Sequence, residues 1–203
     1  QLFSDFSKAK RDFEAINEFS RAGHRFELTA RGKLNTFGLF AELFLNLTRP
    51  KGRSGAILPT GIATDGNSSG FFGHIVAKKR IISLYSFENE EFIFPSVHHS
   101  FRFAILTIGE GTDSVEFSFF LRQTGALEDE RRRFCLTSAE ISRFNPNAQT
   151  APVFRTAGDA KIASAIYGRV PILKANSETG KHTQGLEFRQ GLFNKTVDSD
   201  LLI

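Results

Sequence analysis

The fold is decided by three apolar runs, Ser54-Gly-Ala-Ile-Leu-Pro59, Arg80-Ile-Ile-Ser-Leu-Tyr-Ser86 and Phe101-Arg-Phe-Ala-Ile-Leu-Thr-Ile108. Each run is short and rich in β-branched or aromatic residues, which is typical of strands. Between the first two lies an apolar stretch with helical spacing, formed by Phe71, Phe72, Ile75 and Val76. A strand, a helix and a strand in this order predict a βαβ unit, so we expect the strands at 55–58 and 81–86 to be parallel.

Two further segments complete the expected sheet region. No helical crossover precedes the run at 101–108 or the alternating Val115-Glu-Phe-Ser-Phe-Phe-Leu121. We therefore expect both to be antiparallel strands. The segment Thr60–Gly70 is rich in glycine and serine, which indicates a mobile loop at the carboxyl edge of the sheet.

Two helices are expected before the sheet. Apolar residues at helical spacing predict the first helix from Ser4 to Ala22, with Ser4 or Asp5 as its cap and Gly23 as its terminator. A second helix follows Asn35 and is stopped by the Arg49-Pro50 turn. Its expected buried side consists of Phe37, Phe40, Leu43, Phe44 and Leu47.

The composition changes after residue 127. The run Glu128-Asp-Glu-Arg-Arg-Arg133 is dense in mixed charge, which favours a solvated connector. Thr137-Ser-Ala-Glu140 is a capping box that opens a short helix ending near Phe144, and Asp159 is expected to cap another. We therefore place a domain boundary here, with residues 1–127 and 128–203 as the two parts.

The length and composition of the chain limit the classes of protein to which it can belong. The chain has 203 residues, of which 40% are hydrophobic, enough for a sizeable core. It carries no signal peptide and no run long enough to span a bilayer, so the expected location is the cytoplasm. The net charge of +4 is compatible with a polyanionic partner. The absence of methionine indicates a segment of a longer polypeptide. The single cysteine, Cys135, excludes an internal disulfide and indicates a reducing compartment.

Several local patterns resemble the adenine-specific (N6) DNA methyltransferases of the single-chain type II restriction-modification family. The patterns, in chain order, are Gly32-Lys-Leu-Asn-Thr-Phe-Gly-Leu-Phe40, the stretch from Gly52 to Asp65, Ser86-Phe-Glu-Asn89, Ile93-Phe-Pro-Ser-Val97 and Phe103-Ala-Ile-Leu-Thr107. Later segments look like the opening of that family's target-recognition region, namely Ser142–Asn147, Ala151–Arg155, Asp159-Ala and Ile166–Pro171.

The resemblance implies an α/β fold: the C-terminal half of a doubly wound, Rossmann-like methyltransferase sheet whose last strand is antiparallel, followed by a mainly helix-and-loop recognition region. It implies transfer of a methyl group from S-adenosylmethionine to a flipped adenine in double-stranded DNA. The family's cofactor loop and its Asn-Pro-Pro-aromatic loop are both absent from this sequence. No catalytic residue is therefore assigned, and the implied partners are DNA and the missing N-terminal half of the catalytic domain.

Phe94 and Pro95 lie between the strands at 81–86 and 101–108. In the family, the aromatic residue at this position stacks on the extruded base. A base must leave the duplex before it can be methylated, and a ring held by proline replaces part of the lost stacking. Without the resemblance, a loop aromatic tucked under the sheet would be the simpler interpretation.

A group of cations lies in the region expected to meet DNA. Individually these are ordinary surface residues, but together they would supply salt-sensitive phosphate contacts. The group consists of Arg131, Arg132, Arg133, Arg143, Arg155, Lys161 and Arg169.

Other interpretations were weighed against these. His98-His99 invites a metal site, but adjacent residues of an extended segment point to opposite faces. Asp198 and Asp200 fit a turn better than a nuclease metal site. We therefore expect no metal. The alternative function is a non-catalytic DNA-binding or assembly module with a methyltransferase half-fold, and an unrelated α/β enzyme is a third possibility.

Overall fold

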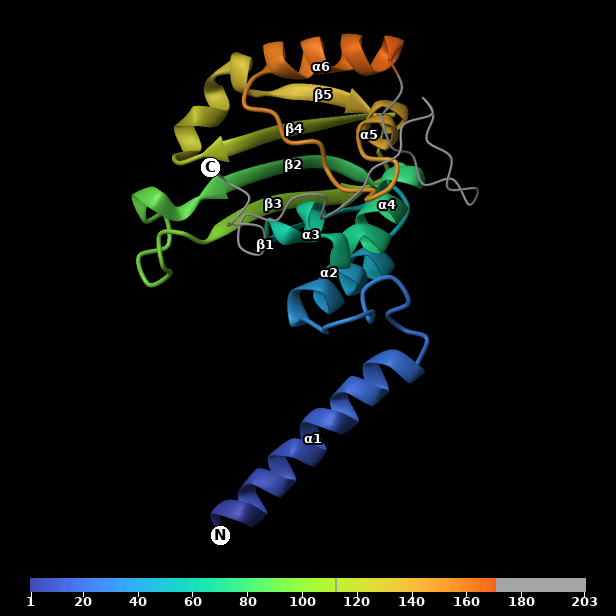
Figure 1. Ribbon diagram of the computed structural model, residues 1–203, viewed down its shortest axis with the longest axis vertical. Coiled ribbons are helices and arrows are strands. Elements are labelled where there is room, and N and C mark those ends of the chain that lie inside the picture. Colours follow the sequence, from blue (N-terminus) through green and yellow to red (C-terminus); the bar gives the residue numbers. More distant parts are fainter. Residues whose placement is uncertain (112, 171–203) are drawn as a thin grey trace, which may run out of the picture.

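Five strands form one mixed sheet, in the order β1-β3-β2-β4-β5 (Figure 1). The computed structural model describes residues 1–111 and 113–170. Within them the strands are β1 (Arg53–Pro59), β2 (Ile81–Glu88), β3 (Arg102–Gly109), β4 (Ser114–Leu121) and β5 (Phe134–Thr137). The expected mixed α/β class is confirmed, and β5 is a strand that the sequence did not reveal.

Strand β3 lies between β1 and β2 and is antiparallel to both. Strands β1 and β2 therefore run in the same direction, as the helix between them predicts, although they are not neighbours. The run at 101–108 was expected to be antiparallel, and this is confirmed. An antiparallel strand placed between two parallel ones agrees with the expected partial, Rossmann-like sheet.

The expectation for the next strand was wrong, because β4 pairs with β2 in parallel and is antiparallel only to β5. The connection after β3 passes the start of β2 and places β4 on its far side. There the N–H of Gly111 donates to the carbonyl of Lys79 at 3.0 Å, and Lys79 Nζ lies 3.1 Å from Asp113. A Cβ on Gly111 would lie 2.7 Å from the Lys79 carbonyl oxygen, so only glycine lets the chain pass so closely.

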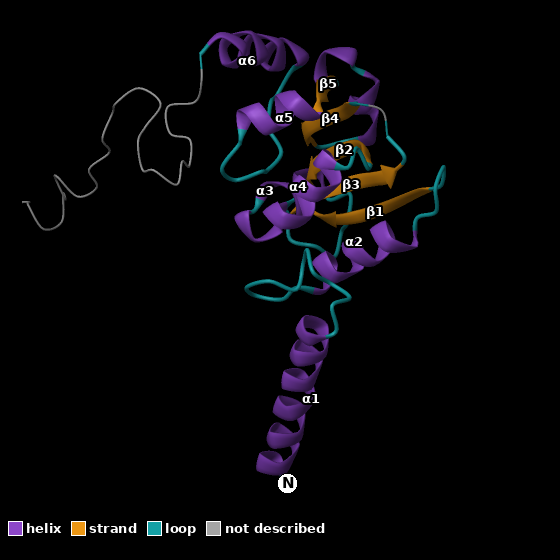
Figure 2. Ribbon diagram, turned by 90° about the vertical axis from the view of Figure 1, so that its right-hand side faces the viewer, coloured by secondary structure: helices purple, strands orange, loops and turns teal. Residues whose placement is uncertain are grey.

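One face of the sheet carries the helices and the main core. Figure 2 shows α3 (Gly61–Thr64), α4 (Ser69–Ala77) and α5 (Ser138–Phe144) on the same side of the strands. The alternate residues of the strands that point to this side are buried against them. The core includes Ile62, Phe71, Phe72, Ile75, Leu84, Leu106, Val115, Phe117, Phe119, Phe134, Leu136 and Ile141.

Helix α1 (Leu2–Ala22) projects from the rest of the chain (Figure 1). It ends at Gly23 as expected, but it begins at Leu2 with Gln1 as its N-cap, so neither Ser4 nor Asp5 caps it. Its apolar stripe faces solvent within the described part of the chain. The exposed large side chains are Leu2, Phe3, Phe6, Phe13, Ile16 and Phe19.

Helix α2 (Thr36–Leu47) has the expected bounds, but its expected buried side is only partly correct. Phe37 is partly buried against the core, whereas two of the five expected residues are exposed. Phe40 is 55% exposed and Leu47 is 68% exposed. The buried positions are instead Gly38, Ala41, Glu42 and Leu45. Small residues let the helix approach its neighbours closely, since a Cβ on Gly38 would already lie 3.4 Å from Thr29.

The segment 60–70 is folded and is not the mobile loop that its glycines and serines indicate. Helix α3 is followed by a 3₁₀ turn, Gly66–Ser68, and then by the first residues of α4. The carboxylate of Asp65 lies against Gly61, where a Cβ would approach it to 2.3 Å. Hydrogen bonds within short turns thus replace the flexibility expected from composition.

Residues after 127 contribute to the same hydrophobic core as the sheet. Strand β5 pairs with β4, and Ile141 of α5 and Ala160 of α6 (Ala157–Arg169) belong to the core cluster. The capping box of Thr137 and Glu140 is present as predicted. For α6 the N-cap is Thr156, and Asp159 is its capping-box partner rather than the cap. The boundary expected near residue 127 thus falls within one core.

Candidate functional site

The carboxyl ends of β1, β2 and β4 meet at one edge of the sheet. This follows from the pairings, because β1 and β2 are both antiparallel to β3 while β4 is parallel to β2. Open α/β sheets bind ligands at this edge. The segments leaving it are the turn at Thr60, the loop 89–101 and the charged segment that begins at Arg122.

Asn89 organises the loop that carries Phe94. Its side chain is completely buried, and its amide nitrogen donates to the carbonyls of Phe94 at 3.0 Å and of Val97 at 2.8 Å. Its amide oxygen accepts from the backbone N–H of Phe94 at 2.9 Å. One buried amide therefore fixes the backbone on both sides of Pro95, which itself is exposed.

The ring of Phe94 is half-buried and rests on the sheet. It meets the ring of Phe103 edge to face at a centroid distance of 4.8 Å, and Phe103 stacks on Phe87 at 5.2 Å. Because Ala104 belongs to the core on the helix side, its neighbour Phe103 projects to the opposite face. The packing gives Phe94 a fixed position with part of its ring accessible, and its role toward a base stays a prediction.

A cavity of about 320 Å³ opens at the carboxyl edge, on the helix side of the sheet. The hydroxyls of Thr60 and Ser86 are 3.0 Å apart there and buried. The residues lining it are Thr60, Gly61, Thr64, Asp65, Ser86, Glu88, Arg102, Phe119, Phe120 and Val153. Phe94 is not among them, since its ring lies on the other face.

Glu88 sits between two arginines at this edge. Its carboxylate lies 3.3 Å from Arg102 and 3.5 Å from Arg122, and Arg122 also pairs with Glu90 at 2.6 Å. The Glu88 side chain is only 13% exposed, whereas both arginines are about half exposed. The network ties the end of β2 to the start of β3 and to the residue after β4, which rigidifies the base of the Phe94 loop.

The structure separates the predicted DNA-binding cations into three kinds. Arg131, Arg132 and Arg155 line one cavity of about 320 Å³, together with Asp129 and Thr156. Arg133 turns toward the sheet, where it lies 3.9 Å from Glu116 with its Nε buried. The remaining cations are exposed on α5 and α6 and are Arg143, Lys161 and Arg169.

Asp129 holds Arg131 in a fixed orientation. Both Nε and a terminal nitrogen of Arg131 donate to the two carboxylate oxygens at 2.9 Å, and the backbone N–H of Arg131 adds a third hydrogen bond at 3.0 Å. Hydrogen bonding from the Arg131 guanidinium lowers the pKa of Asp129 and, reciprocally, raises the pKa of Arg131. Part of the positive charge of this run is therefore already neutralised.

A functional candidate that the sequence did not reveal is Phe120. Its backbone is left-handed, with φ of 58°. It lies at a β-bulge, because between the pairs Tyr85–Ser118 and Phe87–Leu121 strand β4 contains one more residue than β2. Bulges of this kind re-aim a side chain. The Phe120 ring lines the carboxyl-edge cavity and also lies 4.7 Å from the guanidinium carbon of Arg155. In the sequence it looks like an ordinary core residue of a strand, so no signal marks it.

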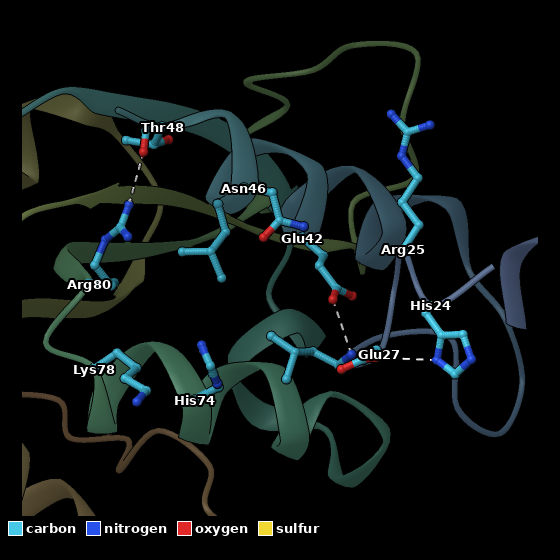
Figure 3. A pocket seen from close by; sticks show the side chains of 11 residues that line it. His24, Arg25, Glu27, Glu42, Asn46, Thr48, His74, Lys78 and Arg80 are labelled. Carbon is cyan, nitrogen blue, oxygen red and sulfur yellow. Dashed lines mark hydrogen bonds and ion pairs between the residues drawn. The ribbon is translucent and has the colours of Figure 1, made fainter. Parts of the chain in front are cut away.

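The largest of these cavities, about 660 Å³, lies near the opposite, amino edge of the sheet (Figure 3). Some of its polar groups pair with one another or with the backbone. Glu42 accepts from the backbone of Leu28 at 3.1 Å, His24 lies 3.4 Å from Glu27, and Arg80 donates to the carbonyl of Thr48 at 3.3 Å. These side chains therefore tie the segment before α2 to the helices.

The turn after β1 is not shaped to hold S-adenosylmethionine. The glycine of the turn after β1, Gly61, is not an open cradle, because the carboxylate of Asp65 fills the space beside it. An acidic group in that place would also repel the carboxylate of the cofactor. If the cofactor is used, other residues must bind it.

In residues 1–111 and 113–170, no three His, Cys, Asp or Glu side chains are grouped so as to hold a metal ion. His98 Nδ1 lies 2.8 Å from the hydroxyl of Ser100, and the rings of His98 and His99 are 4.3 Å apart. Asp198 and Asp200 lie outside the described residues. No helix of the described part is both long and apolar enough to cross a bilayer.

Comparisons with known proteins give matches only among solved structures. No protein-family model and no curated protein matches the chain. Among the solved structures is the methyltransferase subunit of a type I restriction-modification system from Streptococcus thermophilus, which is 12% identical with a TM-score of 0.49 and covers 65% of this chain and 33% of its own. A structure of a type I restriction-modification system is 9% identical with a TM-score of 0.45, covering 70% and 38%.

A third match is the type IIG restriction endonuclease BpuSI, which is 16% identical with a TM-score of 0.42 and covers 61% of this chain and 16% of its own. The chain thus spans between 16% and 38% of the length of these structures. These three structures come from restriction-modification systems. Adenine specificity and the single-chain arrangement stay predictions.

Proposed function

We propose that this chain is a segment of a DNA methyltransferase of a restriction-modification system, which transfers a methyl group from S-adenosylmethionine to N6 of a flipped adenine. The observation that carries the proposal is the position of the Phe94 loop. The loop leaves the carboxyl edge of the sheet, where α/β folds bind their ligands, and Asn89 fixes its backbone.

Phe94 would support the extruded base, with Pro95 stiffening the loop. Extrusion costs a few kcal/mol of lost stacking, and an aromatic face replaces part of it. The ring of Phe94 is already positioned by Phe103, so little conformational entropy would be lost when a base arrives. These contacts support the assignment because they leave part of the ring accessible.

The cofactor loop and the loop that hydrogen-bonds the adenine amino group would come from a further part of the catalytic domain. Two features of the structure suit such a partner. Strand β1 is at the edge of the described sheet, and its Ile57 is 58% exposed on the face opposite the helices. The apolar stripe of α1 is also uncovered within the described residues. Without that partner, no groups position the cofactor and the adenine amino group or stabilise the charge that develops in the transition state. The chain alone should therefore be inactive.

A second function is a non-catalytic DNA-binding or assembly module. The observation that favours it is Asp65 beside Gly61, which leaves no space for a cofactor at the turn after β1. In that case DNA binding would occur without methyl transfer in any polypeptide that contains the segment.

The test uses a polypeptide in which this segment is continuous with a cofactor loop and an amino-group loop. Methyl transfer and fluorescence of 2-aminopurine at the target position are measured for the unchanged protein, for Phe94→Ala, and for Phe92→Ala as a matched control. Phe92 belongs to the same loop and is 54% exposed. We expect Phe94→Ala to lower both signals about tenfold or more, since a stacking contact contributes about 1–3 kcal/mol.

The outcomes separate the two functions. Wild-type transfer and base extrusion in Phe94→Ala would show that Phe94 has no such role. DNA binding without any methyl transfer in the unchanged protein would favour the module. If the unchanged protein neither bound DNA nor transferred a methyl group, both proposed functions would be contradicted.

A further inference from the structure

Three arginines converge on one surface cavity beside the carboxyl edge. The cavity has a volume of about 320 Å³ and is lined by Asp129, Arg131, Arg132, Arg155 and Thr156. Three cations and one carboxylate leave two net positive charges in its lining. It lies next to the carboxyl-edge cavity, because Arg155 of the first contacts Phe120 of the second.

Two of the three arginines are held by other groups. Arg131 forms the bidentate pair with Asp129, and Arg132 donates to the backbone carbonyl of Phe120 at 2.7 Å. These contacts occupy one edge of each guanidinium. A guanidinium has five N–H donors, so both retain donors for a further acceptor.

Arg155 differs from the other two arginines because its N–H groups have no partner among the described residues. It is exposed and makes no hydrogen bond or ion pair with any residue that the structure describes, and its guanidinium lies over the ring of Phe120. Stacking on an aromatic face fixes the plane of the guanidinium but leaves its N–H edge free. The left-handed backbone of Phe120, a strained conformation for a residue other than glycine, places its ring beside Arg155.

We infer that this cavity binds a phosphodiester group of DNA, with Arg155 as the principal ligand and Arg131 and Arg132 as supporting cations. The inference rests on the proposed function, and it specifies which of the predicted cations contact the backbone. A planar guanidinium with a free edge matches two phosphate oxygens through parallel hydrogen bonds.

The geometry favours a phosphodiester over a base. The polar lining consists of arginine donors, one carboxylate that is already paired and the Thr156 hydroxyl, which caps α6, so it offers no pattern that distinguishes base edges. Strand β4 ends at the same edge as the strand that precedes the Phe94 loop. A phosphate bound there would therefore hold DNA at the edge where the base is expected to be extruded.

The experiment measures binding of the 203-residue chain to a fluorescent duplex of about 20 base pairs by anisotropy, at several KCl concentrations from about 50 to 300 mM. Arg155→Gln should raise Kd several-fold at low salt and reduce the slope of log Kd against log salt by about 0.9, the value for one phosphate contact. Arg155→Lys should keep the slope but still raise Kd, because the charge stays while the paired hydrogen bonds are lost.

The matched control is Arg49→Gln, which removes an exposed arginine from the turn before β1, at the opposite edge of the sheet. Its Kd and salt slope should equal those of the unchanged chain. Far-UV circular dichroism verifies that each variant is folded. If Arg155→Gln binds DNA with the unchanged Kd and slope, the assignment is wrong.

A second measurement separates the cavity from the proposed function. Dimethyl phosphate is titrated into the chain against sodium chloride of equal ionic strength, and the Nε–Hε resonance of Arg155 is followed by NMR. A shift with dimethyl phosphate alone supports the phosphodiester site even if the chain binds no duplex, in which case the proposed DNA function is what fails. A resonance that moves with neither dimethyl phosphate nor DNA would overturn the inference.

Discussion

The carboxylate of Glu42 accepts hydrogen bonds from both the backbone N–H and the hydroxyl of Thr29, at 3.0 and 2.7 Å. It also accepts from the N–H of Leu28 at 3.1 Å, and the Glu42 side chain is buried. A buried carboxylate is tolerated only when donors satisfy it. Glu42 therefore ties the segment between α1 and α2 to the body of the protein.

Replacing Glu42 by alanine should lower the free energy of unfolding by about 1–3 kcal/mol, because two partly buried N–H groups and a hydroxyl lose their acceptor. Urea denaturation followed by circular dichroism measures this, and hydrogen exchange at Leu28 and Thr29 should become faster. The control is Glu14→Ala on α1, where the glutamate is exposed and lies 3.8 Å from Lys10. Equal stabilities of the two variants would show that the Glu42 contacts contribute nothing.

Asn89→Asp should loosen the Phe94 loop. An ionised carboxylate still accepts from the N–H of Phe94, but it cannot donate to the carbonyls of Phe94 and Val97 and would repel them. We expect a loss of about 1–3 kcal/mol in unfolding free energy and faster amide exchange across residues 92–97. Asn46→Asp, which changes an exposed amide on α2, is the comparison. If amide hydrogen exchange across residues 92–97 is no faster in Asn89→Asp, Asn89 does not hold the loop in place.

Tyr85 should make stability fall at high pH. Burial, and then its hydrogen bond to Glu116, raise the pKa of Tyr85 from 10.0 to about 12 in the folded protein. The neutral phenol is therefore favoured by folding, so its contribution is complete below pH 10 and is lost as the pH rises from 10 through about 12. Tyr85→Phe should remove this part of the pH dependence of unfolding.

The control for this titration is Tyr167→Phe, which changes the other tyrosine of the chain, a 37% exposed residue of α6. Its unfolding free energy should keep the decline between pH 10 and 12. If Tyr85→Phe retains that decline while Tyr167→Phe loses it, the wrong phenol has been assigned.

Strand β1 should mediate self-association of the isolated chain. It lies at the sheet edge in the described residues, and an edge strand presents unpaired backbone groups to other chains. Lysine on an edge strand opposes such pairing, so Ile57→Lys should shift sedimentation-velocity profiles toward the monomer. Ile162→Lys on α6 replaces an isoleucine of similar exposure away from this edge and should leave them unchanged. Identical profiles for both variants would exclude β1 as the contact.

The expected helices, strands and turns were largely recoverable from local patterns. Apolar periodicity identified α2 and α4, and the spacing of Thr137 and Glu140 identified a capping box. These features depend on residues within one or two turns of each other, so a sequence window contains the information. The position of the Phe94 loop between β2 and β3 followed in the same way.

The cation cluster was only partly predictable. The sequence showed a run of three arginines. The pairing of Arg131 with Asp129 is local, since the two residues are two positions apart, but the turn of Arg133 toward Glu116 and the contact of Arg155 with Phe120 join residues from different elements. The amino-acid composition gives the number of charged side chains but not which arginines are paired with a carboxylate. The left-handed backbone of Phe120 likewise has no local marker.

What the sequence by itself determined was most of the longer elements, though not β5 or the turns of 60–68, and the direction of β1 relative to β2, since a helical crossover enforces parallel strands. The tertiary structure decided the order of the strands, the parallel pairing of β4 with β2 and the buried side of α2. The physical reason is that a strand's pattern records only which of its faces is apolar. Its hydrogen-bonding neighbour is selected by distant segments, such as the close passage of Gly111 beside Lys79, whose effect no local window contains.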